Sequence, residues 1–153
     1  MTQFRREGGK STKMNSPYKG RFIVTQRYKE HEHDGLDLVG IDNKNIYAVE
    51  GGKVIHAGKD KHYGFGNYVA VEIQSGDVWY YGHLSAVKVS LLQAVDKGDL
   101  LGVEGSTGNS TGSHLHICIR KGGSFWKGYD CSPLLGIPNK ETNVPLCNKT
   151  EKE

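Results

Sequence analysis

GNYVAVEIQSGDVWYYGHL, residues 66–84, contains two runs rich in β-branched and aromatic residues on either side of Ser75-Gly76-Asp77. Runs of this composition are typical of strands, and a short turn that contains glycine commonly joins antiparallel strands. The stretch therefore predicts a β-hairpin. Its second strand carries a histidine, His83, close to its end.

The rest of the chain has the same texture of short apolar runs closed by Gly, Asp or Asn. These runs are RFIVTQRY (21–28), NIYAVEGGKVIHAG (45–58), VDKGDLLGVEG (95–105) and SHLHICIRKGG (113–123). They predict an all-β fold of many strands and tight turns, and Gly51-Gly52 predicts a second hairpin turn. Residues 85–97 fit a helical stripe and a strand equally well, so periodicity leaves that segment open.

Length and cysteine content limit the class of protein. A chain of 153 residues is long enough for one domain with its own core. The three cysteines, Cys118, Cys131 and Cys147, have no C-x-x-C spacing, so neither a disulfide framework nor a cysteine zinc knuckle is indicated. We find no apolar stretch of signal-peptide or membrane-spanning length. We expect cytoplasmic synthesis without a signal peptide and no membrane partner.

Charge is distributed unevenly along the chain. Residues 1–29 hold eight Lys or Arg and one Glu, whereas the remainder holds twelve basic and sixteen acidic residues. We expect a basic flexible leader at 1–20, a catalytic domain at 21–138 and a polar tail at 139–153. The leader is either a solvated arm or a contact for an anionic polymer of the cell wall. We expect no nucleic-acid partner.

Four side chains could hold a metal ion. In GSTGNSTGSHLHICIR, residues 105–120, alternation along a strand places His114 and His116 on one face, about 7 Å apart. An isolated pair of this kind also fits an exposed polar face. However, His33 and Asp37 share a face of an extended segment, with Gly35 leaving room between them. With His116 added to His33 and Asp37, two imidazoles and one carboxylate make a three-ligand zinc site. Such a site leaves a fourth position for water, which is the catalytic arrangement.

Three spaced motifs resemble those of one enzyme family. HDGLD (33–37), YYGHLS (80–85) and GSTGNSTGSHLH (105–116) are similar to the H-x-G-x-D, Y-x-H-L-S and G-S-T-G-x-S-T-G-x-H-L-H elements of lysostaphin/LytM-type zinc metallopeptidases. The similarity extends over about residues 21–135. It implies an antiparallel core of the duplicated hybrid motif type, a metal groove between loops, one Zn²⁺ per chain, and hydrolysis of peptide bonds in bacterial peptidoglycan cross-bridges or stem peptides.

The resemblance also implies roles for individual residues. His33, Asp37 and His116 match the zinc ligands, and His83 and His114 match two catalytic histidines that do not bind the metal. The chain lacks an H-E-x-x-H glutamate, and a neutral imidazole can take the role of the base. Which of the two histidines is the base stays open.

For several neighbouring residues the sequence allows two roles. His31 could compete with His33 as a ligand, although the H-x-G-x-D alignment selects His33. Tyr28 is either a carbonyl-stabilising group or a packing residue. Cys118 occupies a position where the family usually has glutamate, and it is either a small packing residue or a thiol near the metal. The loop at 105–116 is expected to form one wall of the groove, and Tyr63, Phe65 and Asn67 are expected to form another.

The leading hypothesis is a zinc endopeptidase that acts on the cell wall, similar to phage or prophage lysins released at the wall or carried in a virion. One alternative is a non-enzymatic cell-wall binding or activator protein with the same fold. A second alternative is a histidine phosphocarrier, because glucose-type phosphotransferase components combine a similar β architecture with a paired-histidine site.

Overall fold

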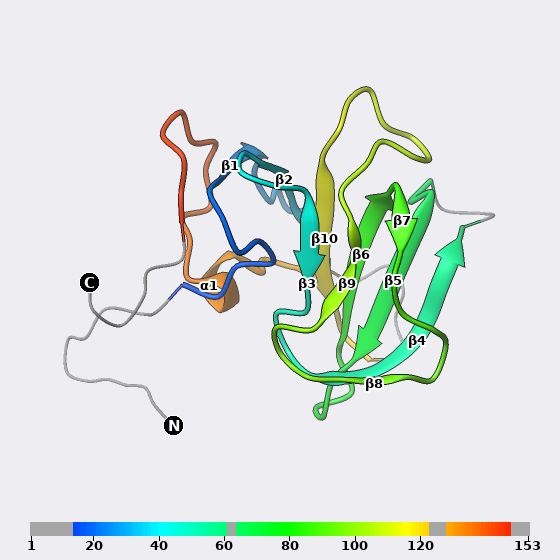
Figure 1. Cartoon of the computed structure of the whole chain (residues 1–153). Coiled ribbons are helices and arrows are strands. Elements are labelled where there is room, and N and C mark those ends of the chain that lie inside the picture. The colour runs from blue at the N-terminus through cyan, green and yellow to red at the C-terminus, as the bar shows by residue number, and fades with distance from the viewer. Residues whose placement is uncertain (1–13, 61–63, 123–127, 148–153) are drawn as a thin grey trace, which may run out of the picture.

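The computed structural model describes residues 14–60, 64–122 and 128–147 (Figure 1). The larger sheet has eight strands, in the order β1-β2-β10-β6-β5-β4-β8, with β11 also paired to β10. These strands are β1 Phe22–Gln26, β2 Leu36–Gly40, β4 Gly52–Lys59, β5 Asn67–Glu72, β6 Val78–Leu84, β8 Ala94–Val95, β10 Leu115–Arg120 and β11 Gly128–Tyr129. A smaller sheet has the order β3-β9-β7, with β3 Asn45–Tyr47, β7 Ala86–Val87 and β9 Leu100–Val103.

Every strand pairing among these elements is antiparallel, which confirms the predicted fold class. The hairpin predicted at Ser75-Gly76-Asp77 joins β5 to β6. The hairpin predicted at Gly51-Gly52 is wrong, because β3 and β4, on either side of it, belong to different sheets. The open segment 85–97 forms two short strands, β7 and β8, joined by turns.

The two central strands, β6 and β10, are buried along their whole length because both faces of the sheet are covered. On one face, Trp79 and Tyr81 join Ile117 and Ile119 in the main hydrophobic core. Residues of opposite parity point to the other face, where Tyr80 and Cys118 belong to a smaller apolar cluster. His116 has the same parity as Cys118, so the histidine lies on the face away from the main core.

The segments at both ends of the described chain pack onto this core. Tyr18, within the predicted leader, is only 1% exposed. Beyond residue 138, Thr142 and Leu146 make backbone hydrogen bonds to Val24 and Phe22 of β1. The division into leader, domain and tail stays a prediction, as does a contact of the leader with wall polymers, and residues 1–13 of that leader lie outside the described part.

A single short helix occurs in the described ranges. α1, Ser132–Leu135, begins with proline in its first turn and ends at Gly136, whose φ of 68° is left-handed. Figure 1 shows it next to the first described segment of the chain, where the Asn15 N–H donates to the carbonyl oxygen of Leu135. None of the described residues forms a helix long and apolar enough to cross a bilayer.

Candidate metal centre

The pairing of β2 with β10 brings the first two site residues together. Asp37 lies directly opposite His116 in this register, and Asp37 Oδ1 is 2.9 Å from His116 Nδ1. On the other side of His116, the opposite residue of β6 is Gly82, which has no side chain beyond Cα. Gly35 is required by close backbone packing, because a Cβ there would lie 2.2 Å from the carbonyl oxygen of Ile117. Its role is to let the H-x-G-x-D segment approach β10.

His33 reaches the same carboxylate from a turn. It precedes β2 and follows a tight turn that begins at Lys29, so the expected extended segment from 33 to 37 is not what joins the pair. His33 Nε2 is 3.1 Å from Asp37 Oδ1, and His33 Nδ1 is 2.8 Å from the carbonyl oxygen of Arg27. A carbonyl can only accept, so Nδ1 carries a proton. Nε2 therefore either donates to Asp37 when it is protonated or offers its lone pair to a metal at this position.

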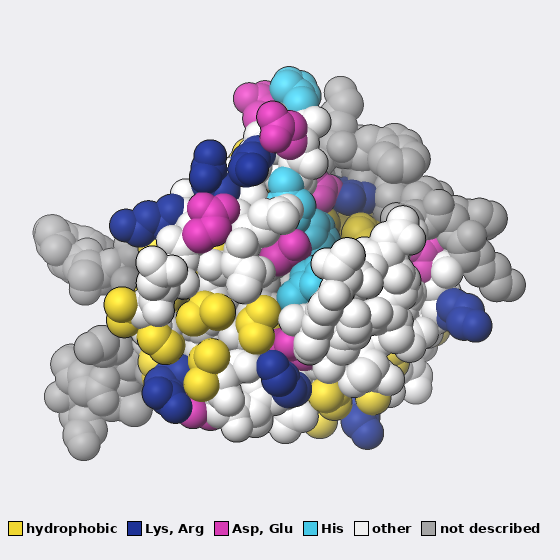
Figure 2. Space-filling view, turned by 90° about the horizontal axis from the view of Figure 1, so that it is seen from above, with side chains coloured by type: hydrophobic (Ala, Val, Ile, Leu, Met, Phe, Trp, Pro, Cys, Tyr) yellow, Lys and Arg dark blue, Asp and Glu magenta, His cyan; other side chains and the backbone are white. Residues whose placement is uncertain are grey.

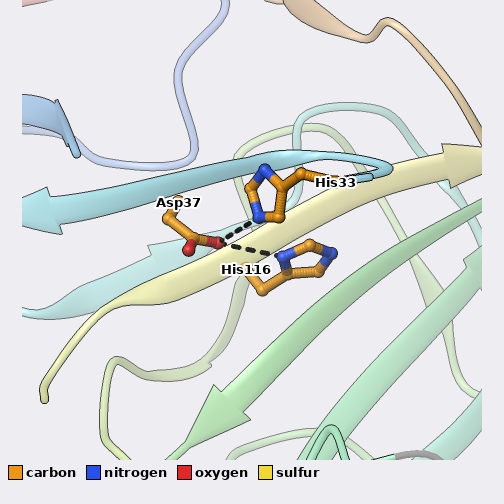
Figure 3. A group of neighbouring side chains, drawn as sticks. All are labelled: His33, Asp37 and His116. Atoms are coloured by element: carbon orange, nitrogen blue, oxygen red, sulfur yellow. Dashed lines mark hydrogen bonds and ion pairs between the residues drawn. The ribbon is translucent and has the colours of Figure 1, made fainter. Parts of the chain in front are cut away.

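The three predicted ligands therefore converge (Figure 3). Their donor atoms all lie within 4.8 Å of one another. Two imidazole nitrogens can face one carboxylate oxygen only if protons or a positive ion lie between them. Two nitrogens and one oxygen are also a donor set that suits Zn²⁺, and three protein ligands leave a fourth tetrahedral position open. The residues present thus fit a divalent metal, and the assignment of each as a ligand stays a prediction.

His83 is aimed at this centre by an irregularity in β6. The register of β6 with β5 shifts next to His83, as at a β-bulge, and the φ of His83 is 65°. Its Nδ1 donates to the carbonyl oxygen of Thr107 at 2.7 Å, which leaves Nε2 with a lone pair. Burial lowers the pKa of His83, and the nearby His114 and His116 lower it further, against a rise from the Thr107 hydrogen bond. The ring is therefore neutral at neutral pH.

His114 lies beside His83 at the end of the glycine-rich loop. Its backbone N–H bonds to Gly105, which closes the loop at its base. His114 Nδ1 donates to the carbonyl oxygen of Gly112 at 2.9 Å, and its Nε2 is 3.6 Å from Asp37 Oδ2. The ring centroids of His83 and His114 are 4.6 Å apart. All five predicted site residues thus share one region of the surface.

This region is an open groove of about 480 Å³. Figure 2 shows histidine and acidic side chains gathered along a depression beside a ridge of uncharged polar residues. The groove is lined by Gln26, His33, Asp37, His83, Asn109, Ser110, Thr111, His114 and His116. The loop at 105–114 supplies one wall, as expected. It can pack against residues 64–67 because Gly66 and Gly108 touch with left-handed φ angles of 69° and 75°.

Comparison with known proteins identifies the family. The model of peptidase family M23 matches residues 31–127, a range that contains all five site residues. The chain belongs to peptidase family M23. Its fold and its three motifs agree with the lysostaphin/LytM-type resemblance of the sequence.

The relatives of this M23 chain include an activator and peptidases. Murein hydrolase activator NlpD of Escherichia coli is 30% identical over 124 residues, which cover 81% of this chain and 31% of NlpD. Peptidoglycan DD-endopeptidase ShyB of Vibrio cholerae is 32% identical over 109 residues, 71% of this chain and 23% of ShyB. The catalytic domain of the antimicrobial peptidase lysostaphin from Staphylococcus simulans superposes with a TM-score of 0.63 at 28% identity, covering 76% of this chain and 92% of that domain. The chain thus spans about a third or less of those two sequence relatives.

The remaining candidate residues, His31, Tyr28 and Cys118, lie outside the groove that holds the five site residues. The side chain of His31 is 89% exposed and contacts Glu30, away from the three converging donors. Tyr28 lines an adjoining groove with His33, and burial and the nearby Glu30 raise the pKa of its hydroxyl. Cys118 is fully buried in the smaller apolar cluster. Its thiol lies near His116 as well, so the packing and metal-contact alternatives both remain.

The expected second wall of the groove is wrong at Phe65. This residue is 7% exposed, and its ring stacks on His116 with centroids 5.8 Å apart. Tyr63 lies outside the described residues. Phe65 therefore packs against the ring of His116 and is not among the residues that line the groove.

Sequence reasoning missed one residue at the M23 centre. Asp34 Oδ1 lies 3.1 Å from His116 Nε2, the ring nitrogen opposite to the one that faces Asp37. Strand alternation had placed Asp34 on the face opposite to His33 and Asp37. A useful signal would have been an acidic residue adjacent to a ligand, because metal-binding histidines usually donate their second N–H to a carboxylate or carbonyl.

Opposed pKa shifts predict an optimum of stability for the metal-free protein. Burial alone would lower the pKa of His116, but hydrogen bonds to Asp34 and Asp37 outweigh it and raise that pKa well above its usual value. Burial alone would raise the pKa of Asp34, but His116 and Arg120 lower it to about 2. The Asp34 contribution is present above about pH 3.9 and is lost as pH falls toward 2, whereas the His116 contribution is present below about pH 6.5 and is lost as pH rises through the raised pKa.

We therefore expect chelator-treated protein to have its highest melting temperature between about pH 4 and 6.5. Thermal unfolding from pH 2 to pH 10 measures this profile. His116→Gln should remove the decline on the alkaline side. An unchanged alkaline decline in this variant would contradict the assignment of the shift to His116.

Proposed function

We propose that this M23 domain is a zinc-dependent endopeptidase that hydrolyses peptide bonds in the cross-bridges or stem peptides of bacterial peptidoglycan. The observation that supports it most is the convergence of His33 Nε2 and His116 Nδ1 on Asp37 Oδ1, at 3.1 and 2.9 Å. His83 and His114 lie in the same groove. A wall substrate is supported by the relatives, whose names refer to murein or peptidoglycan.

In the proposed reaction, His33, Asp37 and His116 hold the metal. Zinc, when bound, polarises the scissile carbonyl and makes hydroxide available near neutral pH. Because the backbone carbonyl oxygen of Arg27 accepts the Nδ1–H of His33, this ring keeps a fixed tautomer. The open groove accepts an extended peptide beside the loop at 105–114.

The proton transfers belong to His83 and His114 in this proposal. Each donates its Nδ1 proton to a backbone carbonyl and so retains an Nε2 lone pair. His83 is neutral at neutral pH because its pKa is lowered, as a base must be. The proton taken from the attacking water is delivered to the departing amine nitrogen, so the pair ends the cycle unchanged.

An activator of other wall hydrolases is the second candidate, because NlpD is among the relatives. An activator needs no set of side chains that binds a metal or acts as a base. The complete set of five residues in this groove favours the hydrolase. Membership of a peptidase family gives no support to the phosphocarrier alternative.

Digestion of defined peptidoglycans tests the proposed function. Zinc-loaded protein should release soluble fragments from purified walls, and mass spectrometry of the fragments identifies the bond that is cut. Removal of zinc with a chelator should stop the release, and added Zn²⁺ should restore it. Release that is equal with and without zinc would exclude the metal mechanism. Stimulation of an added hydrolase, with no release by this protein alone, would favour the activator.

His83 is the site of a further prediction, because its left-handed φ is unfavourable for a residue with a Cβ. His83→Gly relieves this strain and His83→Ala does not. We therefore expect the Ala variant to be less stable than the Gly variant by about 1 kcal/mol, the reverse of the usual order within a strand. Both variants should lose roughly 10²-fold or more in hydrolysis and keep their zinc.

Chemical denaturation, elemental analysis and wall digestion of the two variants measure these effects. Greater stability of the Ala variant would show that φ at this position is not strained. Hydrolysis at the wild-type rate in both would exclude His83 from the reaction.

A further inference from the structure

His116 is oriented differently from the other histidines of the groove. His33, His83 and His114 each donate Nδ1–H to a backbone carbonyl and direct Nε2 elsewhere. His116 instead directs Nδ1 toward Asp37. Its Nε2 faces Asp34 Oδ1 at 3.1 Å, so its outward partner is a carboxylate.

Asp34 is held in place by Arg120, at the end of β10. Arg120 Nε donates to Asp34 Oδ2 at 2.8 Å, and Arg120 Nη2 donates to the same oxygen. Arg120 is 6% exposed, and its guanidinium lies over the rings of Phe65 and Tyr80, 5.3 and 5.0 Å from their centroids. Cation–π contacts of this kind restrict the guanidinium, so the Asp34 carboxylate has a fixed partner.

The backbone of β11 lies close to the Asp34 side chain and restricts where its carboxylate can lie. Gly128 of β11 pairs with Arg120, and a Cβ at Gly128 would lie 3.0 Å from Asp34 Oδ2. The side chain of Asp34 is 30% exposed, and that of His116 is 10% exposed. The contacts form a continuous line from Tyr80 and Phe65 through Arg120 and Asp34 to His116.

We propose that Asp34 is a positioning residue for the metal centre. It fixes His116 in the tautomer with a proton on Nε2, orients the ring, and makes Nδ1 a stronger electron-pair donor toward the metal. The negative charge of the carboxylate favours charge donation by the ring more than a neutral carbonyl does. This inference rests on the proposed zinc centre and adds a residue to it.

Two other roles of Asp34 predict different results. Asp34, His116 and Cys118 have donor atoms within 4.8 Å of one another and could hold a second cation. The guanidinium of Arg120 on the same carboxylate opposes a second positive charge there. Alternatively, the pair of Asp34 with Arg120 could serve stability alone, in which case zinc binding would not depend on the charge of Asp34.

The test is Asp34→Asn, which keeps an oxygen able to accept from His116 Nε2 and removes the charge. We expect zinc affinity, measured by competition with a chelating dye, to fall roughly 10- to 100-fold. The ¹⁵N and ¹H resonances of His116 Nε2–H in the zinc-loaded protein should move away from the downfield position of a hydrogen bond to a carboxylate. Asp34→Glu, which restores a carboxylate, should recover part of the affinity.

Asp42→Asn is the matched control. Asp42 also pairs with an arginine, Arg21, at 2.8 Å, but at an exposed position outside the groove. Its zinc affinity should equal that of the wild type. Melting of each metal-free variant separates lost metal affinity from lost folding.

The outcomes are distinguishable. Equal zinc affinity and an unmoved Nε2–H resonance in Asp34→Asn would overturn the positioning role. Two zinc ions per wild-type chain, with one lost in the variant, would overturn it in favour of a second cation site. Wild-type protein that binds no zinc would instead remove the proposed function on which the inference depends.

Discussion

Asp37→Ala should yield a folded protein that retains no zinc and hydrolyses peptidoglycan at least about 10³-fold more slowly, since the metal contributes several kcal/mol to the transition state. Asp37 Oδ1 is the atom that His33 and His116 both face, and its other oxygen faces His114. Its removal would take away the oxygen donor and, with it, the negative charge that would balance a bound metal. No other carboxylate among the described residues occupies this position between the two histidines.

Asp42→Ala is the control for this experiment, because it removes an exposed aspartate outside the groove. Elemental analysis after dialysis measures bound zinc, and release of labelled wall fragments measures hydrolysis. The control should keep both properties. If Asp37→Ala retained one zinc per chain and cleaved walls at the wild-type rate, the proposed ligand set would be wrong.

Glu104→Ala should greatly lower the free energy of unfolding. The side chain of Glu104 is fully buried and accepts hydrogen bonds from the Tyr18 hydroxyl, the Gly40 N–H and the Ser113 hydroxyl. Lys44 pairs with the same carboxylate at 3.3 Å. Each buried donor left without an acceptor costs about 1–3 kcal/mol, so we expect a loss of roughly 3–5 kcal/mol.

For a chain of this length, that loss corresponds to a fall in melting temperature of roughly 10 °C or more. Glu72→Ala, at an exposed position in β5, is the control and should change the melting temperature little. Ser113 immediately precedes His114, so the Glu104 variant should also loosen the loop wall of the groove. A melting temperature within about 2 °C of the wild type would show that these donors find other acceptors.

Local patterns in the sequence were enough for the fold class and for the members of the candidate site. Strand composition and glycine turns depend on neighbouring residues, so the antiparallel β fold and the 75–77 hairpin were predictable. The H-x-G-x-D, Y-x-H-L-S and H-L-H motifs identified the five residues that the groove brings together. The same local reasoning failed at Gly51-Gly52, because the partner of each strand is chosen by packing far along the chain.

The orientation of the site side chains could not be predicted from residue identities. The contacts of His116 with Asp37 and Asp34 span 79 and 82 residues of sequence. Which ring nitrogen faces the metal position depends on the acceptor at the other nitrogen, and that acceptor comes from a different segment in each case. The left-handed turn at His83 likewise depends on its place in the sheet.

The amino-acid sequence alone thus predicted an all-β fold, a lysostaphin/LytM-type resemblance, and two imidazoles and a carboxylate as candidate ligands, because these features are encoded in short, contiguous motifs. Only the tertiary structure showed which atoms lie in contact. It placed Asp34 against His116 Nε2, Arg120 against Asp34, and the ring of Phe65 against the His116 ring. Those contacts arise only when the sheet pairs β2 with β10 and β10 with β6, since hydrogen bonds act over about 3 Å and segments distant in sequence must first be packed together.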